Sequence, residues 1–590
     1  MTLAAIAPLL ATLALWAPGL NIPERVTFGP EEEYMPSISP DGQLLAFVSN
    51  RDNSPNIWVI SLEGARFSTP LRLTSVSSGG KGPAFSPDGK SVAYVSYGAD
   101  AEGDIHRVSL PDKYGHGPEP EPITGFDTAD REPAFFPDGK RILFTSISKT
   151  GAGDGLTIVD TGGKQATRLI AGGRSAAISP SGSRIAFIAP GEKGPSALHL
   201  ASAEGGPAMA LASGEYIDAS PVFASEDQII FVRYIDDTNL DGALTFDDRP
   251  ALYRLDLASP ASPPAPLTTT ESFNLFPAVH GGVIYYTIQE GKSVDIYRLA
   301  MAGVVPTTGS LEGDMRQAEQ VERFYTDRPA LALLAWRAAW AVNHDDPDKA
   351  SLAECLIHQA QLLERGGAFP SAQAALTRLM ELYPGQGPQV AQAAVTLTRI
   401  EGQRLGRPAE WIVQQQTAHM ERYANIPRPA AMARLERGRA FLRQGRPELA
   451  LEDFRGVMGG LQATLPDLAA EAAFLRNEVY SLFGAEDKRL LVYLEVVEKF
   501  PEQAKWRDMA LERIIELSMA PGDLKASILN LSALAEKYAH LPYVRATAME
   551  KQAQLYLQAN ETAMASQIYS HMARIFAGGP QAGAALLGLG

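Results

Sequence analysis

The chain has almost no cysteine, with only Cys355 among its 590 residues. One cysteine cannot form an intrachain disulfide, which excludes a small scaffold held together by such bonds. Because Leu352 and Leu356 place Cys355 in an apolar helix pattern, we interpret it as a buried structural thiol and not as a nucleophile. The length also excludes a single core, so two or more domains are expected.

Basic residues are fewer than acidic ones, 52 against 68, which gives a net charge of -16 and a pI of about 5.2. A surface of this charge repels phosphate backbones, so nucleic acid is not an expected partner. The remaining composition, with 45% hydrophobic and 20% charged residues, is ordinary for a globular protein.

Long apolar runs are missing beyond the first residues, and only the run from Leu3 to Leu20 approaches the roughly 18 residues that a membrane span requires. It is similar to the core of a secretory signal, although the first basic residue is Arg25. We therefore interpret residues 1–21 as a signal peptide or N-terminal anchor and expect a periplasmic or secreted protein. An uncleaved anchor or a buried N-terminal helix are the alternatives.

A repeated turn is the main feature that is present. Pro-Asp-Gly occurs at Pro40–Gly42, Pro87–Gly89 and Pro137–Gly139, and Pro180–Gly182 is a Pro-Ser-Gly copy. Asp caps its own backbone two residues on and Gly accepts positive φ, so each copy predicts a tight turn between strands. The surrounding frame recurs every 43–56 residues, which is typical of four-stranded propeller blades. The six units begin at Pro36, Pro83, Pro133, Ala176, Pro221 and Pro277.

The sixth unit has no clear fourth strand before Pro306. Because Glu24–Phe28 is similar to the fourth strand of the first unit, Leu71–Thr74, we expect the N-terminal segment to supply the missing strand. This closure would protect the sheet edges of the ring. Residues 22–305 are thus predicted to form a six-bladed β-propeller.

The repeated frame, seen best in Pro36–Ser49, Pro83–Ser96 and Pro133–Ser146, resembles the WD40-like (PD40) repeat of the TolB propeller family. The resemblance extends from about Pro23 to Val305 and implies a propeller. It does not imply one function, since similar repeats occur in periplasmic scaffolds, in propellers of prolyl-oligopeptidase-type peptidases and in some sugar lyases. TolB's own partners are not carried over, because here a helical half follows the propeller.

One loop in the fifth unit has the ligand spacing of an EF-hand. Gly242 takes the sixth position, where the chain turns sharply, and the last position holds Asp in place of the usual, longer Glu. We predict a structural Ca²⁺ site in this loop, between two strands; the alternative is a solvated Asp/Asn-rich turn with side-chain caps. The predicted ligands are Asp237, Asn239, Asp241, Ala243 through its carbonyl, Thr245 and Asp248.

From about Leu311 onward, Ala, Leu, Glu, Gln and Arg recur at helical spacing. The small and aromatic positions are similar to those of tetratricopeptide (TPR) repeats, most clearly between Ala433 and Val457. We expect a linker over residues 306–329 and a TPR-like α-solenoid over 330–590. Such a solenoid has a concave groove for peptides or partner helices; the alternative is that its helices pack only on the propeller or on one another.

Catalytic motifs are scarce, with no Gly-x-Ser-x-Gly, no His-x-x-x-His and no phosphate loop in the sequence. Charged residues at the start of the inner strands could line the mouth of a central channel, but a solvated rim is the favoured interpretation. These residues are Glu31, Glu32, Glu33, Asp130, Arg131, Glu132 and Asp218.

The sequence as a whole favours a non-enzymatic protein–protein interaction scaffold or adaptor of the cell envelope. Its expected partners are envelope or secreted proteins, bound by the TPR groove and the propeller faces, with membrane association only through an uncleaved N-terminal segment. Two alternatives remain open. One is a propeller enzyme acting on polysaccharide or peptide, and the other is a ligand-sensing propeller that signals through the TPR region.

Overall fold

The computed structural model describes residues 20–577, apart from 63–68, 75–78, 99, 112–118, 126–127, 149–153, 164–165, 192–193, 212–213 and 260–261. The apolar segment that we interpret as a signal or anchor therefore lies outside the described residues, except for its end. The chain divides into two compact units, residues 1–386 and 387–590. In the part of the chain that the structure describes, no helix has the length and apolar composition needed to cross a membrane.

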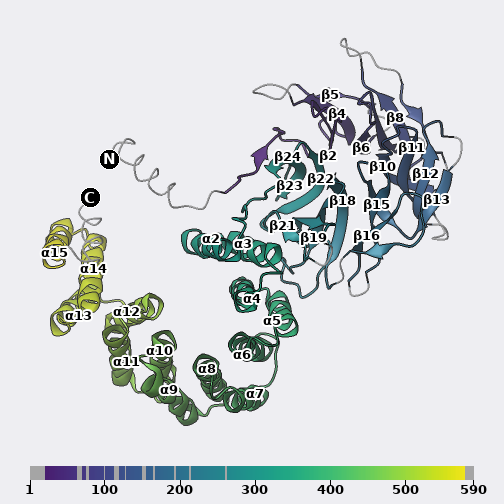
Figure 1. Ribbon diagram of the computed structural model, residues 1–590. Helices are drawn as coiled ribbons and strands as arrows, with labels where there is room; N and C mark the ends of the chain where they lie inside the picture. The colour runs from purple at the N-terminus through teal and green to yellow at the C-terminus, as the bar shows by residue number, and fades with distance from the viewer. Residues whose placement is uncertain are drawn as a thin grey trace. The chain divides into compact units, whose positions relative to one another are not determined.

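Six sheets of four strands form the propeller, as the sequence predicts (Figure 1). Blade one contains β2 (Glu33–Ile38), β3 (Leu44–Ser49), β4 (Asn56–Ser61) and β5 (Leu71–Arg72). Blade two contains β6 (Lys81–Phe85), β7 (Ser91–Ser96), β8 (Asp104–Ser109) and β9 (Glu121–Pro122). Blade three contains β10 (Thr128–Phe135), β11 (Arg141–Ser148), β12 (Gly155–Asp160) and β13 (Ala166–Ala171).

The remaining blades follow in chain order. Blade four contains β14 (Arg174–Ile178), β15 (Arg184–Ala189), β16 (Ala197–Ser202) and β17 (Met209–Ala210). Blade five contains β18 (Ile217–Ser225), β19 (Gln228–Tyr234), β20 (Ala251–Asp256) and β21 (Ala265–Pro266). Blade six contains β22 (Phe273–His280), β23 (Val283–Glu290), β24 (Ser293–Ala300) and the N-terminal β1 (Glu24–Arg25).

The N-terminal strand closes the ring, which confirms the prediction. β1 pairs antiparallel with β24, with Glu24 opposite Arg298 and Arg25 opposite Tyr297. The following residue, Val26, is completely buried, and its amide donates to the carbonyl of Ile296 at 2.8 Å. Because the innermost strands of neighbouring blades touch all the way around, this pairing closes the ring between the first and last blades.

Second strands are continuous apolar runs, and the reason is that each blade is covered on both faces by its neighbours. In β3 and β7 five successive residues are buried. The side chains of β3 and β4 pack against those of β6 and β7 in one cluster that includes Val48 and Tyr94. An alternating pattern of apolar and polar residues would leave one face unable to pack.

The Pro-Asp-Gly turns have the expected chemistry. Asp41 Oδ1 accepts from the Gln43 amide at 3.1 Å, and Gly42 has φ +75°. The same contacts recur at the second and third copies, and in the fourth the hydroxyl of Ser181 replaces the carboxylate. Hydrogen bonds from the Ser39 hydroxyl, which has the larger effect, and from the Gln43 amide lower the pKa of Asp41.

Each inner strand also has a bulge that the sequence analysis did not predict. The residue before each of the six frame positions has a positive φ, and the pairing register shifts there. Five of the six are not glycine, a conformation that costs energy and is kept only where the surrounding structure requires it. The six residues are Met35, Gly82, Glu132, Ser175, Ser220 and Phe276.

Fourteen helices lie in the described part of the chain after the propeller. Four belong to the first unit: α2 (Leu311–Phe324), α3 (Pro329–Val342), α4 (Lys349–Arg365) and α5 (Phe369–Leu382). The second unit contains α6 (Gly387–Gln403), α7 (Ala409–Arg422), α8 (Pro427–Arg443), α9 (Pro447–Leu461), α10 (Pro466–Leu482), α11 (Glu486–Lys499), α12 (Ala504–Ser518), α13 (Leu524–Lys537), α14 (Pro542–Gln558) and α15 (Thr562–Ile575).

The expectation of a linker over 306–329 is wrong, because this segment contains α2. The hydroxyl of Ser310 caps the helix by accepting from the Gly313 amide, and Ala318 and Val321 are buried. The next helix, α3, is apolar on nearly all sides, with ten of its fourteen residues buried. Such a helix is stable only when other elements surround it, and α3 packs between α2, α4 and β21.

From α4 onward the helices form antiparallel pairs in which the first helix is the longer one. These first helices begin at Lys349, Gly387, Pro427, Pro466, Ala504 and Pro542, so the pair recurs about every 38–40 residues. The period exceeds the roughly 34 residues of a TPR, and the TPR assignment stays a prediction. The small-residue positions do pack closely: a Cβ on Gly438 would lie 2.6 Å from the Phe454 ring. Cys355 is buried in α4, and burial raises its pKa to about 12.

Candidate functional site

The loop predicted to bind calcium connects β19 to β20 in blade five. Its two ends are buried, since Asp237 is 7% exposed and Asp248 is 0% exposed. Asn239, Asp241 and Ala243, between them, are exposed. Gly242 has φ +90°, as the sharp turn at the sixth position requires. The chain thus folds back on itself between the two buried carboxylates.

Backbone amides donate hydrogen bonds to the carboxylate oxygens of this loop. Asp237 accepts from the amides of Asp241 at 3.1 Å and Gly242 at 2.8 Å. Asp248 accepts from the amides of Thr238 at 2.7 Å and Thr245 at 2.9 Å. These bonds hold both ends of the loop closed.

The exposed ligand candidates form two further caps. Asn239 Oδ1 accepts from the Asp241 amide at 3.0 Å, and Asp241 Oδ1 accepts from the Ala243 amide at 2.9 Å. The arrangement brings the six predicted ligand residues into one closed loop. Within the described residues, however, no three His, Cys, Asp or Glu side chains gather as they would around a metal ion. Calcium binding therefore stays a prediction.

The residue just before this loop makes a buried ion pair between the propeller and the helices of the first unit. Both oxygens of Asp236 accept from the guanidinium of Arg337 in α3, at 2.6 and 2.7 Å. The two side chains are only 4% and 13% exposed. Burial alone would lower the pKa of Arg337, but the Asp236 carboxylate outweighs it and raises that pKa above its usual range. A paired, charge-assisted contact of this kind is strong and directional.

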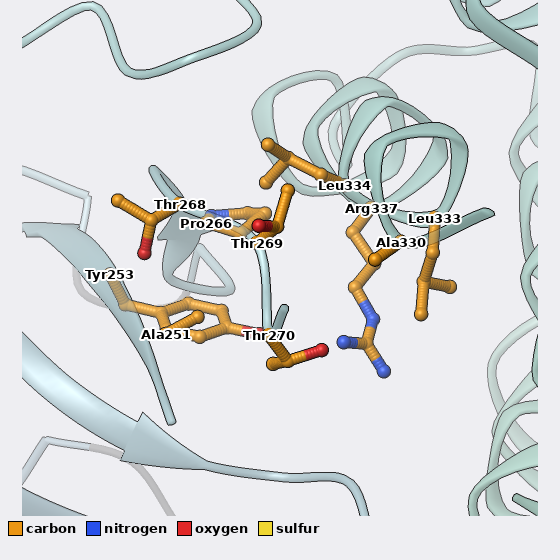
Figure 2. A pocket seen from close by; sticks show the side chains of 10 residues that line it. All are labelled: Ala251, Tyr253, Pro266, Thr268, Thr269, Thr270, Ala330, Leu333, Leu334 and Arg337. Carbon is orange, nitrogen blue, oxygen red and sulfur yellow. The ribbon is translucent and has the colours of Figure 1, made fainter. Parts of the chain in front are cut away.

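The surfaces around this ion pair fit closely. Figure 2 shows Tyr253 and Thr268–Thr270 of blade five facing Leu333, Leu334 and Arg337 of α3. The cavity between them has a volume of about 10 Å³. Since one water molecule needs roughly 10–15 Å³ of such space, the seam holds a water at most and is not a substrate pocket.

The loop itself also contacts the helices. Leu240 has φ +62° and lies against the turn between α4 and α5, where a Cβ on Gly367 would be 3.4 Å from its Cδ1. At the other end of the loop, Arg249 donates to the carbonyls of Thr238 at 3.3 Å and Glu271 at 3.2 Å. The conformation of the loop is therefore coupled to the packing of α3–α5 on blade five.

Sequence reasoning missed Asp236 and Arg337, although one signal was present. Arg337 is the only charged residue between Pro329 and Val342, in the most apolar of the helices that the structure describes. A lone charge in such a helix needs a buried partner. The partner could not be chosen from the sequence, because Asp236 stands beside the acidic loop and is indistinguishable from it.

Three of the acidic residues expected on a solvated rim are instead buried between blades, which corrects that interpretation. Glu33, Asp130 and Asp218 are each at most 1% exposed. Glu33 pairs with Arg51, and Asp218 accepts two bonds from Arg233 at 2.7 and 2.9 Å. For Glu33 and Asp218 the physical reason is that a buried carboxylate requires a counter-charge, which an arginine of the same blade supplies.

Asp130 has no such arginine. Its Oδ1 accepts from the hydroxyls of Thr128 and Ser146, both at 2.9 Å, and its Oδ2 has no partner. Burial raises the pKa of Asp130, and the charge of Asp104 adds to the effect. Glu132, which is exposed, accepts from the Ser175 amide at 2.8 Å and so links blades three and four.

The second unit contains an open groove between α8 and α10. Its volume is about 540 Å³, within the range of ligand sites. Apolar and charged side chains share its walls, and Leu482 is 62% exposed. The lining residues are Arg439, Leu442 and Arg443 from α8 and Asn477, Glu478, Ser481 and Leu482 from α10.

The ion pair between Asp236 and Arg337 gives a first prediction. Arg337→Met should lower the free energy of unfolding by about 3–5 kcal/mol, because it leaves Asp236 buried without a counter-charge. The double variant Asp236→Asn/Arg337→Met should regain part of the loss. Equilibrium urea unfolding of the full chain measures both.

The matched control is Arg316→Met, which breaks the exposed pair with Glu312 and should cost less than about 1 kcal/mol. Equal destabilisation by Arg337→Met and Arg316→Met would contradict the importance of the buried pair. So would a double variant that is no more stable than Arg337→Met alone.

Comparison with known proteins finds one family match and several similar solved structures. The family model described as TolB beta propeller domain (PD40) matches residues 24–239. Similar solved structures include a putative TolB from Agrobacterium tumefaciens (18% identity, 47% of this chain and 92% of that chain, TM-score 0.35). TolB from Acinetobacter baumannii is also similar (18% identity, 45% of this chain and 63% of that chain, TM-score 0.31). So is an oligogalacturonate lyase from Vibrio parahaemolyticus (15% identity, 48% of this chain and 91% of that chain, TM-score 0.33).

No curated protein matches the chain. The family match covers the blades that contain the well-formed Pro-Asp-Gly turns and ends inside the loop of blade five, at residue 239. Its span covers β1, blades one to four and the first two strands of blade five, and it includes all four copies of the repeated turn. Residues 24–239 of this β-propeller are therefore similar to the TolB beta propeller domain.

Proposed function

We propose that the protein is a non-enzymatic scaffold that binds other proteins in the cell envelope. The observation that carries this proposal is the open groove between α8 and α10. Arrays of helix pairs present extended surfaces of this kind, because each pair is stabilised by its neighbours and the remaining face is free to bind. Peptides and partner helices are recognised by grooves with apolar anchor positions, which Leu442 and Leu482 would supply here.

The propeller and α2–α5 would act as a rigid platform in this scaffold. Their seam is closed by Asp236 and Arg337 and has no room for a substrate. Glu33, Asp130 and Asp218 on the inner strands are buried and are not exposed to a ligand. Together with the catalytic motifs missing from the sequence, these features favour binding over catalysis.

The proposed location is the periplasm or the exterior of the cell. It rests on the apolar run from Leu3 to Leu20 and on the TolB-like propeller. The acidic surface, with a net charge of -16, supports protein partners over nucleic acid.

Site-specific crosslinking in intact cells tests the scaffold proposal with the full chain. A photo-reactive residue at Ser481, in the groove, should give discrete crosslinked proteins. The same residue at Glu452, exposed on α9 and outside the groove, is the control and should not give them. If Ser481 gives no crosslinked protein, or the same proteins as Glu452, the proposal fails.

We also propose that the loop from Asp237 to Asp248 binds calcium, with a structural role. The support is the ligand spacing together with the burial of both end carboxylates. Ca²⁺ coordinates six to eight oxygen ligands, and this loop supplies them from within a dozen residues. A bound ion would tighten the loop against blade five, next to Asp236.

Calcium should therefore raise the melting temperature of the wild type relative to a sample with a chelator, because a ligand of the folded state stabilises it. Asp241→Ala removes one ligand and should abolish the shift. Asp160→Ala is the matched control, since Asp160 caps a similar turn by accepting from the Gly162 amide at 2.8 Å. Equal calcium shifts in the wild type and Asp241→Ala, measured by calorimetry, would rule the site out.

A further inference from the structure

Helix α8 carries an unusual number of cations for a chain with a net charge of -16. Its only acidic residue is Glu436. A concentration of positive charge on one helix of an acidic protein needs either internal partners or an external anion. The five arginines of α8 are Arg428, Arg434, Arg437, Arg439 and Arg443.

Four of the five have carboxylate partners. Arg428 pairs with Asp467 on α10, and Arg437 pairs with Asp453 on α9 at 2.7 Å. Arg439 is held between Glu436 and Glu471. Arg434 lies 3.9 Å from Asp453.

Arg443 is different. No ion pair involving it occurs among the described residues, and its side chain is exposed in the groove between α8 and α10. Partial burial of the Arg443 side chain and the positive charge of Arg439 lower the pKa of Arg443, whereas the negative charge of Glu436 raises it. A cation next to a like charge and without its own carboxylate gains most from an anionic ligand.

The other residues of the groove indicate that its ligand also has an apolar group beside the anionic one. Leu442 precedes Arg443 on α8, and Leu482 faces the groove from α10 with 62% of its surface exposed. Leu442 is partly buried, so the two leucines offer a partly exposed apolar surface beside a cation. Such a surface suits a ligand whose apolar side chain lies beside a carboxylate. Glu478, on the α10 wall, would oppose a second negative charge on that side.

We propose that this groove binds a peptide segment in which a carboxylate lies beside an apolar side chain. The carboxylate binds Arg443, and the apolar side chain packs on Leu442 and Leu482. This inference rests on the proposed scaffold function and names the chemistry of its partner.

The test uses the full chain and a short fluorescein-labelled peptide of alternating glutamate and leucine, with binding followed by fluorescence anisotropy. Replacing its glutamates with glutamine should weaken binding about tenfold, since one charge-assisted contact is lost. Replacing its leucines with serine should weaken binding as well.

Protein variants then locate the contact. Arg443→Gln should weaken binding of the glutamate peptide about tenfold and remove the preference for glutamate over glutamine. Arg455→Gln, which makes the same charge change on an exposed position of α9, should leave the affinity unchanged. Glu478→Gln should tighten binding, because it removes a like charge from the groove.

The inference is overturned if the protein binds neither peptide or binds both equally, or if Arg443→Gln and Arg455→Gln have the same effect. Such a result would leave the scaffold proposal standing as long as Ser481 still crosslinks to proteins in cells. If the crosslinks from Ser481 are lost but the protein still prefers the glutamate peptide over the glutamine peptide, only the scaffold role is contradicted.

Discussion

The buried ion pair between Asp236 and Arg337 is the contact on which the arrangement of the first unit depends. Two charges removed from water are stable only when each satisfies the other, so the pair fixes where α3 can sit on blade five. The seam around it leaves no space larger than a water molecule. As a result, α2–α5 are part of the propeller's body, and the chain divides after Gln386 instead of at the end of the last blade.

Much of the propeller could be predicted because its information is local. An Asp that caps the amide two residues on and a Gly with positive φ make the same turn wherever they occur, as Asp41 and Gly42 show. Continuous apolar second strands follow from blades that are covered on both faces. The closure of the ring by β1 could also be predicted, because blade six lacks a fourth strand in its own sequence and another segment had to supply it.

Features that depend on contacts between distant segments could not be predicted. The bulge residues, such as Met35 and Phe276, have no sequence signal of their own, because neighbouring blades impose their conformation. The partner of Arg337 is about a hundred residues away in the chain. Within the candidate calcium loop the spacing predicted which residues would come together, but not that backbone amides would occupy their carboxylates. The helix pairs were recognised from small residues such as Gly438, whereas their period depends on helix lengths that sequence patterns define poorly.

We expect the propeller and α2–α5 to unfold as one cooperative body, separately from the helix pairs of the second unit. Native-state hydrogen exchange of the full chain in low urea tests it most directly, because segments that unfold together exchange with the same free energy of opening. We expect the amides of α3 to open together with those of β19 and β20, whereas the amides of α8 and α10 open in a separate event. Exchange of α3 together with α8 and α10, and independently of the propeller strands, would contradict it.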